Sequence, residues 1–329
     1  MHLGFAVPWP DEGSWLWEFL PPGVSGDLLL AAPSPGTHKL PPYIGEWIHL
    51  ARRGYDLSRY EVVFAWELRS ALAVALLRRR VPRTRRPHFV AVGPILKGPL
   101  LRALPVVRHL LADADKIVCF SRAECDDNAR LLRLPRDRFL FLPTPWRADE
   151  EISQKDDGFL LALGQSNRDY PTLLRAVRGT DLPVTIVAAN PTALGGVEAS
   201  PNVTVRYNTG HHETNELIAR ATLHCIPLHN TAYSSGQTVL LRAMARGKAV
   251  VVSNTPGVRD YVRNGETAVI VPPGDAGALC AALTHLWHDE GARRRIGQNG
   301  AKEVREEFGF ARFTERLVSL AHDLTQSQP

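Results

Sequence analysis

Small hydroxyl, glycine and amide residues stand directly before an apolar-periodic segment in the second half of the chain. They are Ser234, Ser235, Gly236, Gln237 and Thr238, and the helical period continues through Leu240, Ala243 and Met244. Such residues at a helix start leave backbone N–H groups free to bind an anion. The segment therefore predicts a helix that begins at a diphosphate and ends at Gly247.

A short apolar run, Ala249 to Val252, follows this helix and is typical of a parallel strand that is covered on both faces. Thr255-Pro256-Gly257 then turns the chain at the carboxyl end of that strand. Open α/β sheets bind ligands at this edge, so the order of elements predicts a nucleotide-sugar site.

The elements that must position this site alternate between short apolar strands and helical periods, which favours parallel sheets covered by helices. The clearest helices are Leu68–Arg79 and Arg122–Leu134. Strands are expected near Leu3–Val7, Asp27–Ala31, Val62–Ala65, His88–Val92, Ile117–Phe120 and Phe139–Leu142, and again near Phe159–Leu163, Val184–Ala188, Val203–Arg206, Leu223–Ile226, Ala249–Val252 and Val269–Val271.

A chain of 329 residues is long enough for two domains that each bury a core. The polar, acidic connector from Pro143 to Asp157 predicts a boundary near residue 150, with domains at 1–150 and 151–310. The last helix, Ala311 to about Leu324, follows Phe308 and Phe310 and needs an apolar surface, so we expect residues 311–329 to return to the first domain.

Several classes of protein are excluded by what the sequence lacks. There is no basic leader and no apolar run long enough to span a bilayer, which predicts a cytoplasmic protein. No GxGxxG or GxxxxGK[ST] pattern is present, which argues against nicotinamide dehydrogenases and P-loop kinases. The four cysteines have neither a CxxC pair nor zinc spacing, so we expect four reduced thiols.

The formal net charge of +5 arises in residues 1–150, around an arginine cluster that comprises Arg78, Arg79, Arg80, Arg83, Arg85 and Arg86. A solvated helix end with a basic loop is one interpretation, and contact with an anionic lipid or a phosphorylated acceptor is another. No aromatic residues are interleaved with these arginines, which disfavours nucleic acid as a partner.

Ordered blocks from about Asp157 to Leu320 resemble the donor domain of retaining glycosyltransferases of family 4. The blocks are Leu163-Gly164 with Arg168 to Leu174, Glu216-Leu217 with Ile226-Pro227-Leu228, and Ala243-Met244-Ala245 through Val271-Pro272-Pro273-Gly274-Asp275. The resemblance implies the GT-B fold, an α/β architecture of two Rossmann-like doubly wound domains that face each other across a cleft. The first half resembles the family only loosely.

The resemblance also implies an enzyme that needs no metal or other cofactor and uses a nucleoside-diphosphate sugar as donor. Donor contacts would come from Gly164, Gln165, Arg168, Ser234, Ser235, Gly236, Gln237, Thr238 and Arg242. Arg168 matches a basic residue that contacts the diphosphate in the family, and it is our first candidate for a catalytic role.

Two family glutamates spaced Glu-x7-Glu are replaced here by Ser234 and Arg242. A guanidinium only donates hydrogen bonds, so Arg242 cannot accept from a ribose diol. It either contacts a phosphate, is displaced, recognises an unusual nucleotide, or is an exposed helix residue. Gln165 stands where the family has an arginine.

Candidate acceptor residues come from three loops of the first domain. The first loop holds Asp11, Glu12, Gly13 and Ser14, the next holds Trp66 and Glu67, and Gly93 lies where the family often has a histidine. Asp11 or Glu12 could act as a general base or bind acceptor hydroxyls, with Asp11 as the catalytic candidate. Glu67 is a further catalytic candidate, because its carboxylate lies beside Trp66, a candidate sugar-stacking surface. Alternatively, the first loop is simply solvated and Glu67 is a dipole-stabilised residue at a helix start.

Two further patterns resemble metal sites. Asp113-Ala114-Asp115 has a DxD form, but it precedes an expected strand. His211-His212-Glu213 has no third ligand at useful spacing, and we expect a solvated loop there before a helix at Asn215–Ala221.

The sequence thus predicts a glycosyltransferase that acts on a small-molecule acceptor in specialised metabolism, such as antibiotic biosynthesis. A membrane-associated lipid or polysaccharide glycosyltransferase is an alternative, as is an inactive glycosyltransferase-like partner subunit. The base, the sugar, the linkage atom and the oligomeric state are left open.

Overall fold

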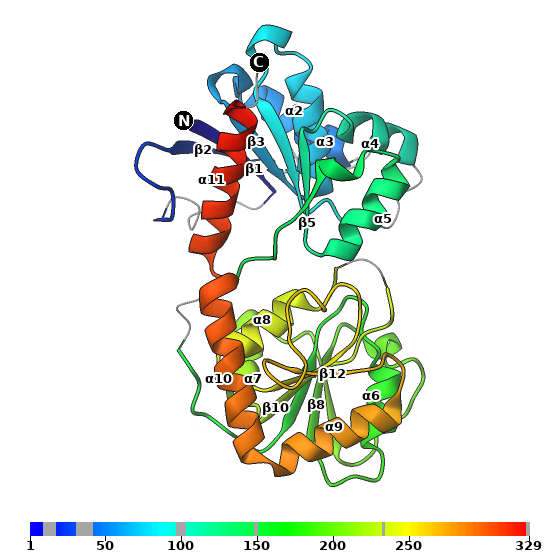
Figure 1. Cartoon of the computed structure of the whole chain (residues 1–329). Coiled ribbons are helices and arrows are strands. Elements are labelled where there is room, and N and C mark those ends of the chain that lie inside the picture. The colour runs from blue at the N-terminus through cyan, green and yellow to red at the C-terminus, as the bar shows by residue number, and fades with distance from the viewer. Residues whose placement is uncertain (9–17, 31–41, 97–102, 148–150, 232–233, 327–329) are drawn as a thin grey trace. The chain divides into compact units, whose positions relative to one another are not determined.

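The computed structural model describes residues 1–8, 18–30, 42–96, 103–147, 151–231 and 234–326. The chain folds into two compact units (Figure 1). Unit 1 comprises Met1–Pro143 with Phe310–Pro329, and unit 2 comprises Thr144–Gly309. The division lies a few residues before the position near 150 that the connector suggested, and the last helix belongs to unit 1.

The described residues of unit 1 form a six-stranded parallel sheet in the order β2-β1-β3-β4-β5-β6. Its strands are β1 His2–Val7, β2 Ser25–Leu30, β3 Val62–Trp66, β4 His88–Val92, β5 Lys116–Cys119 and β6 Phe139–Phe141. β3 is buried along its whole length because helices cover both faces, as its apolar sequence indicates.

One face of this sheet is covered by α2 Pro42–Arg52, α3 Glu67–Arg78, α4 Leu104–Leu111 and α5 Arg122–Leu132. The other face is covered by α11 Phe310–Gln326, whose Phe313 and Leu317 pack on Phe5 and Phe64. Figure 1 shows α11 beside the strands of unit 1. Phe313 of α11 therefore completes the core on this face of unit 1, whereas Phe308, which precedes the helix, packs against Tyr261 in unit 2.

Unit 2 has a second six-stranded parallel sheet among its described residues, in the order β12-β11-β10-β7-β8-β9. Its strands are β7 Leu160–Leu163, β8 Val184–Ala188, β9 Val203–Tyr207, β10 Leu223–Ile226, β11 Val250–Ser253 and β12 Val269–Val271. β9 alternates between half-buried and exposed residues because it is an edge strand. The predicted α/β class with two Rossmann-like units is confirmed.

Helices cover both faces of the second sheet (Figure 1). They are α6 Tyr170–Val177, α7 His211–Arg220, α8 Gln237–Ala245, α9 Ala276–His288 and α10 Glu290–Glu307. α6 and α9 pack on one face, whereas α7, α8 and the end of α10 pack on the other.

Strand order reverses once in each sheet. In unit 1 the reversal lies between β1 and β3, and in unit 2 it lies between β7 and β10. The loops that leave two such strands run in opposite directions, so a crevice for a ligand opens at the carboxyl ends of the strands. Ligand-binding side chains are therefore expected at these two places.

Candidate functional site

The loops that follow β7 and β10 are tied together by one amide. Nδ2 of Asn167 lies 2.9 Å from the carbonyl oxygen of His229, 2.8 Å from Oγ1 of Thr231 and 3.2 Å from Oγ of Ser235. Asn167 has a φ of 59°, a conformation that asparagine tolerates better than most residues. Asn167 thus joins the strand-reversal point of unit 2 to the segment that starts α8.

Arg168 is buried beneath this loop, with 9 % of its surface exposed. Its Nε donates to the carbonyl of Leu163 at 2.9 Å, and its Nη1 donates to the carbonyl of Ser166 at 2.7 Å. The guanidinium lies against Gly164, which has a φ of 129°. Gln165 is exposed at the tip of the same loop. Arg168 is therefore held in one orientation by its own loop.

Tyr170 supports the loop from the core. Its hydroxyl lies 2.7 Å from the carbonyl oxygen of Gly164 and 3.0 Å from that of Val187. Burial raises the pKa of Tyr170 above its usual range, so the phenol keeps its proton and donates it. Asp169 caps α6 by accepting from the backbone N–H of Thr172 at 3.1 Å.

The start of α8 differs from the starts of α6, α9 and α10, which carry side-chain caps. Asp169, Asp275 and Asp289 cap α6, α9 and α10 through their side chains, whereas α8 and α7 begin at glycines without a side-chain cap among the described residues. Gly236 has a φ of 89° and packs against Ile226 and Leu228. The first N–H groups of α8 are thus left for another acceptor.

Interactions within unit 2 hold α8 in this position. Gln237 is buried and its Nε2 donates to the carbonyl of Gly257 at 2.6 Å, while the backbone N–H of Leu228 donates to Oγ of Ser253 at 2.9 Å. Leu228 also forms a backbone bridge with Arg168. Ser234 is half-buried, Ser235 is buried, and Thr238 is exposed on the first turn.

Arg242 is buried, with 8 % of its surface exposed, which corrects the interpretation of an exposed helix residue. Its Nη2 donates to Oδ1 of Asn215 in α7, and its guanidinium carbon lies 5.7 Å from the ring centre of Trp146. Trp146 donates its backbone N–H to the carbonyl of Phe308 at 2.8 Å. The residue at the usual ribose position is therefore engaged in packing between α7 and the start of unit 2.

The strand-reversal point of unit 1 places Glu67 directly after β3. Glu67 has a φ of 61°, which is rare for a residue other than glycine and costs of order 1–3 kcal/mol. Its carboxylate is partly exposed and lies 4.0 Å from Nη2 of Arg69. A strained, accessible carboxylate at this edge agrees with a candidate acceptor site.

Two other residues predicted to bind the acceptor are covered by aromatic side chains. Trp66 is 6 % exposed and its ring lies 6.1 Å from that of Phe313 in α11, which corrects the expectation of a sugar-stacking surface. Gly93 is buried under Phe120, whose Cζ would lie 2.7 Å from an added Cβ. Asp11, Glu12, Gly13 and Ser14 lie outside the described residues.

The arginine cluster is partly structural. Arg78 lies 3.8 Å from Asp115, and Arg79 donates to Asp113 at 2.6 Å, so these arginines neutralise the two aspartates of the DxD pattern. Arg86 donates to the carbonyls of Val81 and Arg79. Arg80, Arg83 and Arg85 are exposed and remain candidates for a basic contact.

The remaining sequence predictions concern histidines and cysteines. His211, His212 and Glu213 are exposed, but they form the first turn of α7 rather than a loop, because the helix begins at His211. Cys119, Cys125, Cys225 and Cys280 are free and lie in strands or helices, as predicted.

The described residues contain neither a membrane-spanning helix nor a cluster of metal-ligating side chains. Within these ranges we find no helix with the length and hydropathy of a bilayer span. The same part of the chain contains no cluster of three or more His, Cys, Asp and Glu that could ligate a metal ion.

Three contributors to the site were not predicted from the sequence. Asn167 carries one signal, an asparagine beside a basic residue in a polar loop, where a left-handed conformation is common. Asn215 and Trp146 carry none, because their contacts with Arg242 join segments that are far apart in the chain.

Residues 196–303 match the family described as glycosyl transferases group 1. The capsular polysaccharide biosynthesis glycosyltransferase CapM of Staphylococcus aureus is 35 % identical over 94 residues, which cover 29 % of this chain and 24 % of CapM. The matched segment thus spans about a quarter of the length of that relative.

Solved structures match almost the whole chain. Sucrose-phosphate synthase from Thermosynechococcus elongatus superposes with a TM-score of 0.77 at 15 % identity, covering 99 % of this chain and 100 % of that one. HepE from Anabaena, in complex with UDP-glucose, superposes with a TM-score of 0.73 at 12 % identity, covering 98 % and 100 %. These structural similarities show the fold. The family match and the similarity to CapM support an enzyme that transfers glycosyl groups.

Proposed function

We propose that this chain is a glycosyltransferase that binds a nucleoside-diphosphate sugar at the carboxyl edge of the unit 2 sheet. The observation that carries the proposal is the uncapped start of α8 beside the buried Arg168, at the point where strand order reverses. The free N–H groups, the helix dipole and the guanidinium all favour the charge of a diphosphate. The UDP-glucose bound by HepE supports a donor of this class.

The same groups suit the reaction step. When the bond between the sugar and the diphosphate breaks, negative charge develops on the leaving oxygen, and fixed donors stabilise it. We place the chemistry in the retaining class of family 4, in which the acceptor attacks from the same face and its proton passes to the leaving phosphate. Because the protein itself supplies this charge stabilisation, turnover should persist in EDTA.

We assign acceptor binding to unit 1. Glu67 is the described residue that supports this assignment, because it is strained, partly exposed and at the strand-reversal point. Asp11, Glu12, Gly13 and Ser14 follow β1 in the sequence and lie outside the described residues. We propose a small-molecule acceptor, with Glu67 or Asp11 hydrogen-bonded to its nucleophilic group.

A polysaccharide or lipid-linked acceptor is the second candidate. It is favoured by the similarity to CapM, whose name refers to capsular polysaccharide, and by the exposed Arg80, Arg83 and Arg85. Binding to anionic liposomes that weakens as salt rises would favour a lipid-linked acceptor, whereas no binding would argue against it.

Titration of the protein with UDP, GDP, ADP and dTDP tests the donor site, first by thermal shift and then by calorimetry. Thr238→Asp places a carboxylate on the first turn of α8, where it favours the helix but repels a diphosphate. We expect this variant to keep its thermal stability and to lose about tenfold or more in affinity, whereas the neutral Thr238→Asn variant retains binding.

The possible outcomes separate the hypotheses. Nucleotide binding with turnover of a matching sugar donor supports the enzyme, and proton NMR of the product gives the anomeric configuration. Nucleotide binding without turnover on any acceptor would favour an inactive partner subunit. If none of the four nucleotides binds, the proposed donor site is wrong.

A further inference from the structure

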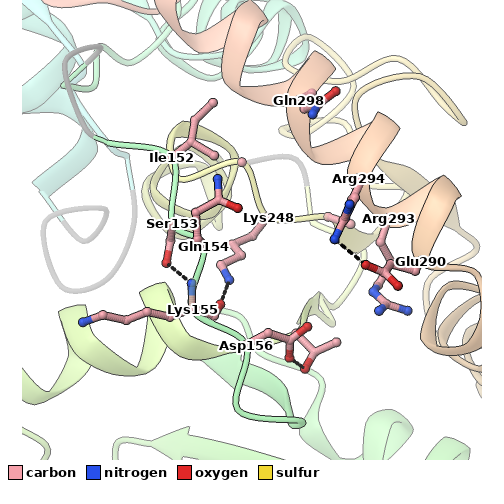
Figure 2. A pocket seen from close by; sticks show the side chains of 13 residues that line it. Ile152, Ser153, Gln154, Lys155, Asp156, Lys248, Glu290, Arg293, Arg294 and Gln298 are labelled. Carbon is pink, nitrogen blue, oxygen red and sulfur yellow. Dashed lines mark hydrogen bonds and ion pairs between the residues drawn. The ribbon is translucent and has the colours of Figure 1, made fainter.

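A cavity of about 330 Å³ lies at the opposite edge of the unit 2 sheet from the proposed donor site. Its walls are the segment Ile152–Asp156, the turn Gly247–Ala249, Thr222, and the first half of α10 (Figure 2). Thr222 and Ala249 directly precede β10 and β11, so the cavity is at the amino ends of the strands. The proposed donor site does not use any of these residues.

Lys248 is the most informative residue in this cavity. Its side chain is buried, with 7 % of the residue exposed, and its Nζ donates to the backbone carbonyl of Lys155 (Figure 2). An ammonium has three donors, and within the described ranges this is its one hydrogen bond. No carboxylate among the described residues pairs with it, although a buried cation is costly without a partner.

No negative charge among the described residues contacts the ammonium of Lys248 to offset its burial. Burial lowers the pKa of Lys248, and the negative charges of Asp156 and Asp157 oppose this shift without contacting the ammonium. Asp156 accepts from Oγ1 of Thr222 and from the backbone N–H of Gly158. Both hydrogen bonds end on Oδ1, so this oxygen is engaged within the loop that precedes β7.

The other charged side chains give the cavity a positive balance. Lys155, Lys248, Arg293 and Arg294 line it, against Asp156 and Glu290. Glu290 is paired with Arg294 at 2.6 Å, and Lys155 is paired with Glu216 at 3.2 Å. Arg293 gives Nη1 to the carbonyls of Leu286 and Trp287, which leaves its Nε and Nη2 without a partner in the described part of the chain. Two cations thus remain available for a ligand.

We propose that this cavity binds a small phosphorylated molecule, with its phosphate on Lys248 and its organic part toward Arg293 on the opposite wall. Phosphate accepts charge-assisted hydrogen bonds from an ammonium, and hydroxyl groups of the organic part accept hydrogen bonds from a guanidinium. The volume is near the lower end of the range for small-molecule sites, which fits a sugar phosphate or a nucleoside monophosphate better than a larger ligand. Bound there, the ligand joins the segment Ile152–Asp156 to α10 and stabilises unit 2.

Titration of the whole chain with inorganic phosphate, glucose 6-phosphate and AMP tests the proposal, with sodium chloride as the ionic-strength control. We expect saturable calorimetric binding of at least one of the two organic phosphates in the millimolar range or tighter. Binding of inorganic phosphate but of neither organic phosphate would support the anion site and overturn the site for the organic part of the ligand. Hydrogen exchange read by mass spectrometry should show protection of peptides that cover 151–157 and 246–250.

Lys248→Met removes the charge, keeps the length and relieves the burial of an ammonium, so the variant should fold. We expect it to weaken phosphate-ligand binding about tenfold or more, because hydrogen bonds to charged groups contribute at this level. Lys155→Met is the matched control, since that ammonium pairs with Glu216, and its affinity should stay within about twofold of the wild type. Arg293→Gln on the opposite wall gives an independent loss of affinity.

Absence of saturable binding for all three compounds would overturn the proposal. So would equal affinities in the wild type, Lys248→Met and Arg293→Gln. Protection from hydrogen exchange that is confined to residues 234–240 would assign the anion to the start of α8. The cavity at the amino ends of the strands would then be rejected as the binding site. None of these outcomes depends on whether the chain transfers a sugar.

Discussion

The guanidinium of Arg168 fills the space that a side chain at position 164 would need. A Cβ on Gly164 would lie 2.6 Å from Nε of Arg168, well inside van der Waals contact, and the φ of 129° is open only to glycine. The glycine of the first loop and the arginine four residues later therefore form one unit. The sequence pattern alone gives their spacing but not this contact.

Gly164→Ala should disable the donor site although it removes no side chain that is proposed to bind the donor. The methyl group would displace Arg168 from Leu163 and Ser166, so nucleoside-diphosphate affinity should fall about tenfold or more in calorimetry. Gly158→Ala is the control, because Gly158 has a φ of 71° but nothing within 4 Å of an added Cβ. It should cost roughly 1–2 kcal/mol of stability and leave affinity unchanged. Equal affinities in both variants would show that the position of Arg168 does not matter for binding.

Arg242 should prove structural rather than a donor ligand. Arg242→Met removes the hydrogen bond to Asn215 and the contact with Trp146, so we expect a loss of about 1–3 kcal/mol in urea unfolding. Nucleotide affinity should stay within about twofold, because the guanidinium is committed to these partners. A double-mutant cycle with Asn215→Ala measures their coupling. A tenfold loss of affinity with unchanged stability would instead place Arg242 on the donor.

Most of the fold follows from local sequence, and most of the site does not. Every strand of the described residues lies within about two residues of its expected position. The inner strands are found because buried parallel strands are apolar, and the edge strand β9 because its apolar residues alternate. The sequence does not reveal that the Trp66 ring is covered, because its partner, Phe313, comes from the other end of the chain. The sequence does not decide the role of Arg242 for the same reason, because its partners Trp146 and Asn215 are far from it in the chain. Local patterns predict which residues reach the ligand edge, but tertiary partners decide which of them are covered.

His224 should make the protein acid-sensitive. It is fully buried, its Nε2 lies 3.0 Å from the carbonyl oxygen of Ile218, and burial lowers its pKa to about 3 from an ordinary 6.5. The unfolded chain binds a proton below about pH 6.5 and the folded chain does not until about pH 3, so stability is complete above 6.5 and falls as the pH drops. The total effect at pH 3 is roughly 4–5 kcal/mol.

Urea unfolding of wild type and His224→Gln between about pH 7 and pH 4 isolates this contribution, because other groups titrate equally in both proteins. The amide can still donate to Ile218. The stability advantage of the wild type over the variant should shrink as the pH falls. A constant difference across this range would mean that His224 is not buried as a neutral group.

Gly297 allows α10 to pack directly on the turn between α8 and β11. An added Cβ would lie 2.7 Å from the backbone carbonyl carbon of Gly247, and backbone atoms cannot rotate away as a side chain can. Gly297→Ala should therefore cost about 3 kcal/mol or more, even though alanine favours helices. Gly291→Ala in the same helix meets only Oδ1 of Asp289 at an ordinary 3.4 Å and should gain about 0.5–1 kcal/mol. Thermal and urea unfolding of the two variants compares them directly. The affected turn carries Lys248, so Gly297→Ala should also weaken ligand binding in the cavity at the amino ends of the unit 2 strands. Equal stabilities of the two alanine variants would mean that α10 does not contact Gly247 as described.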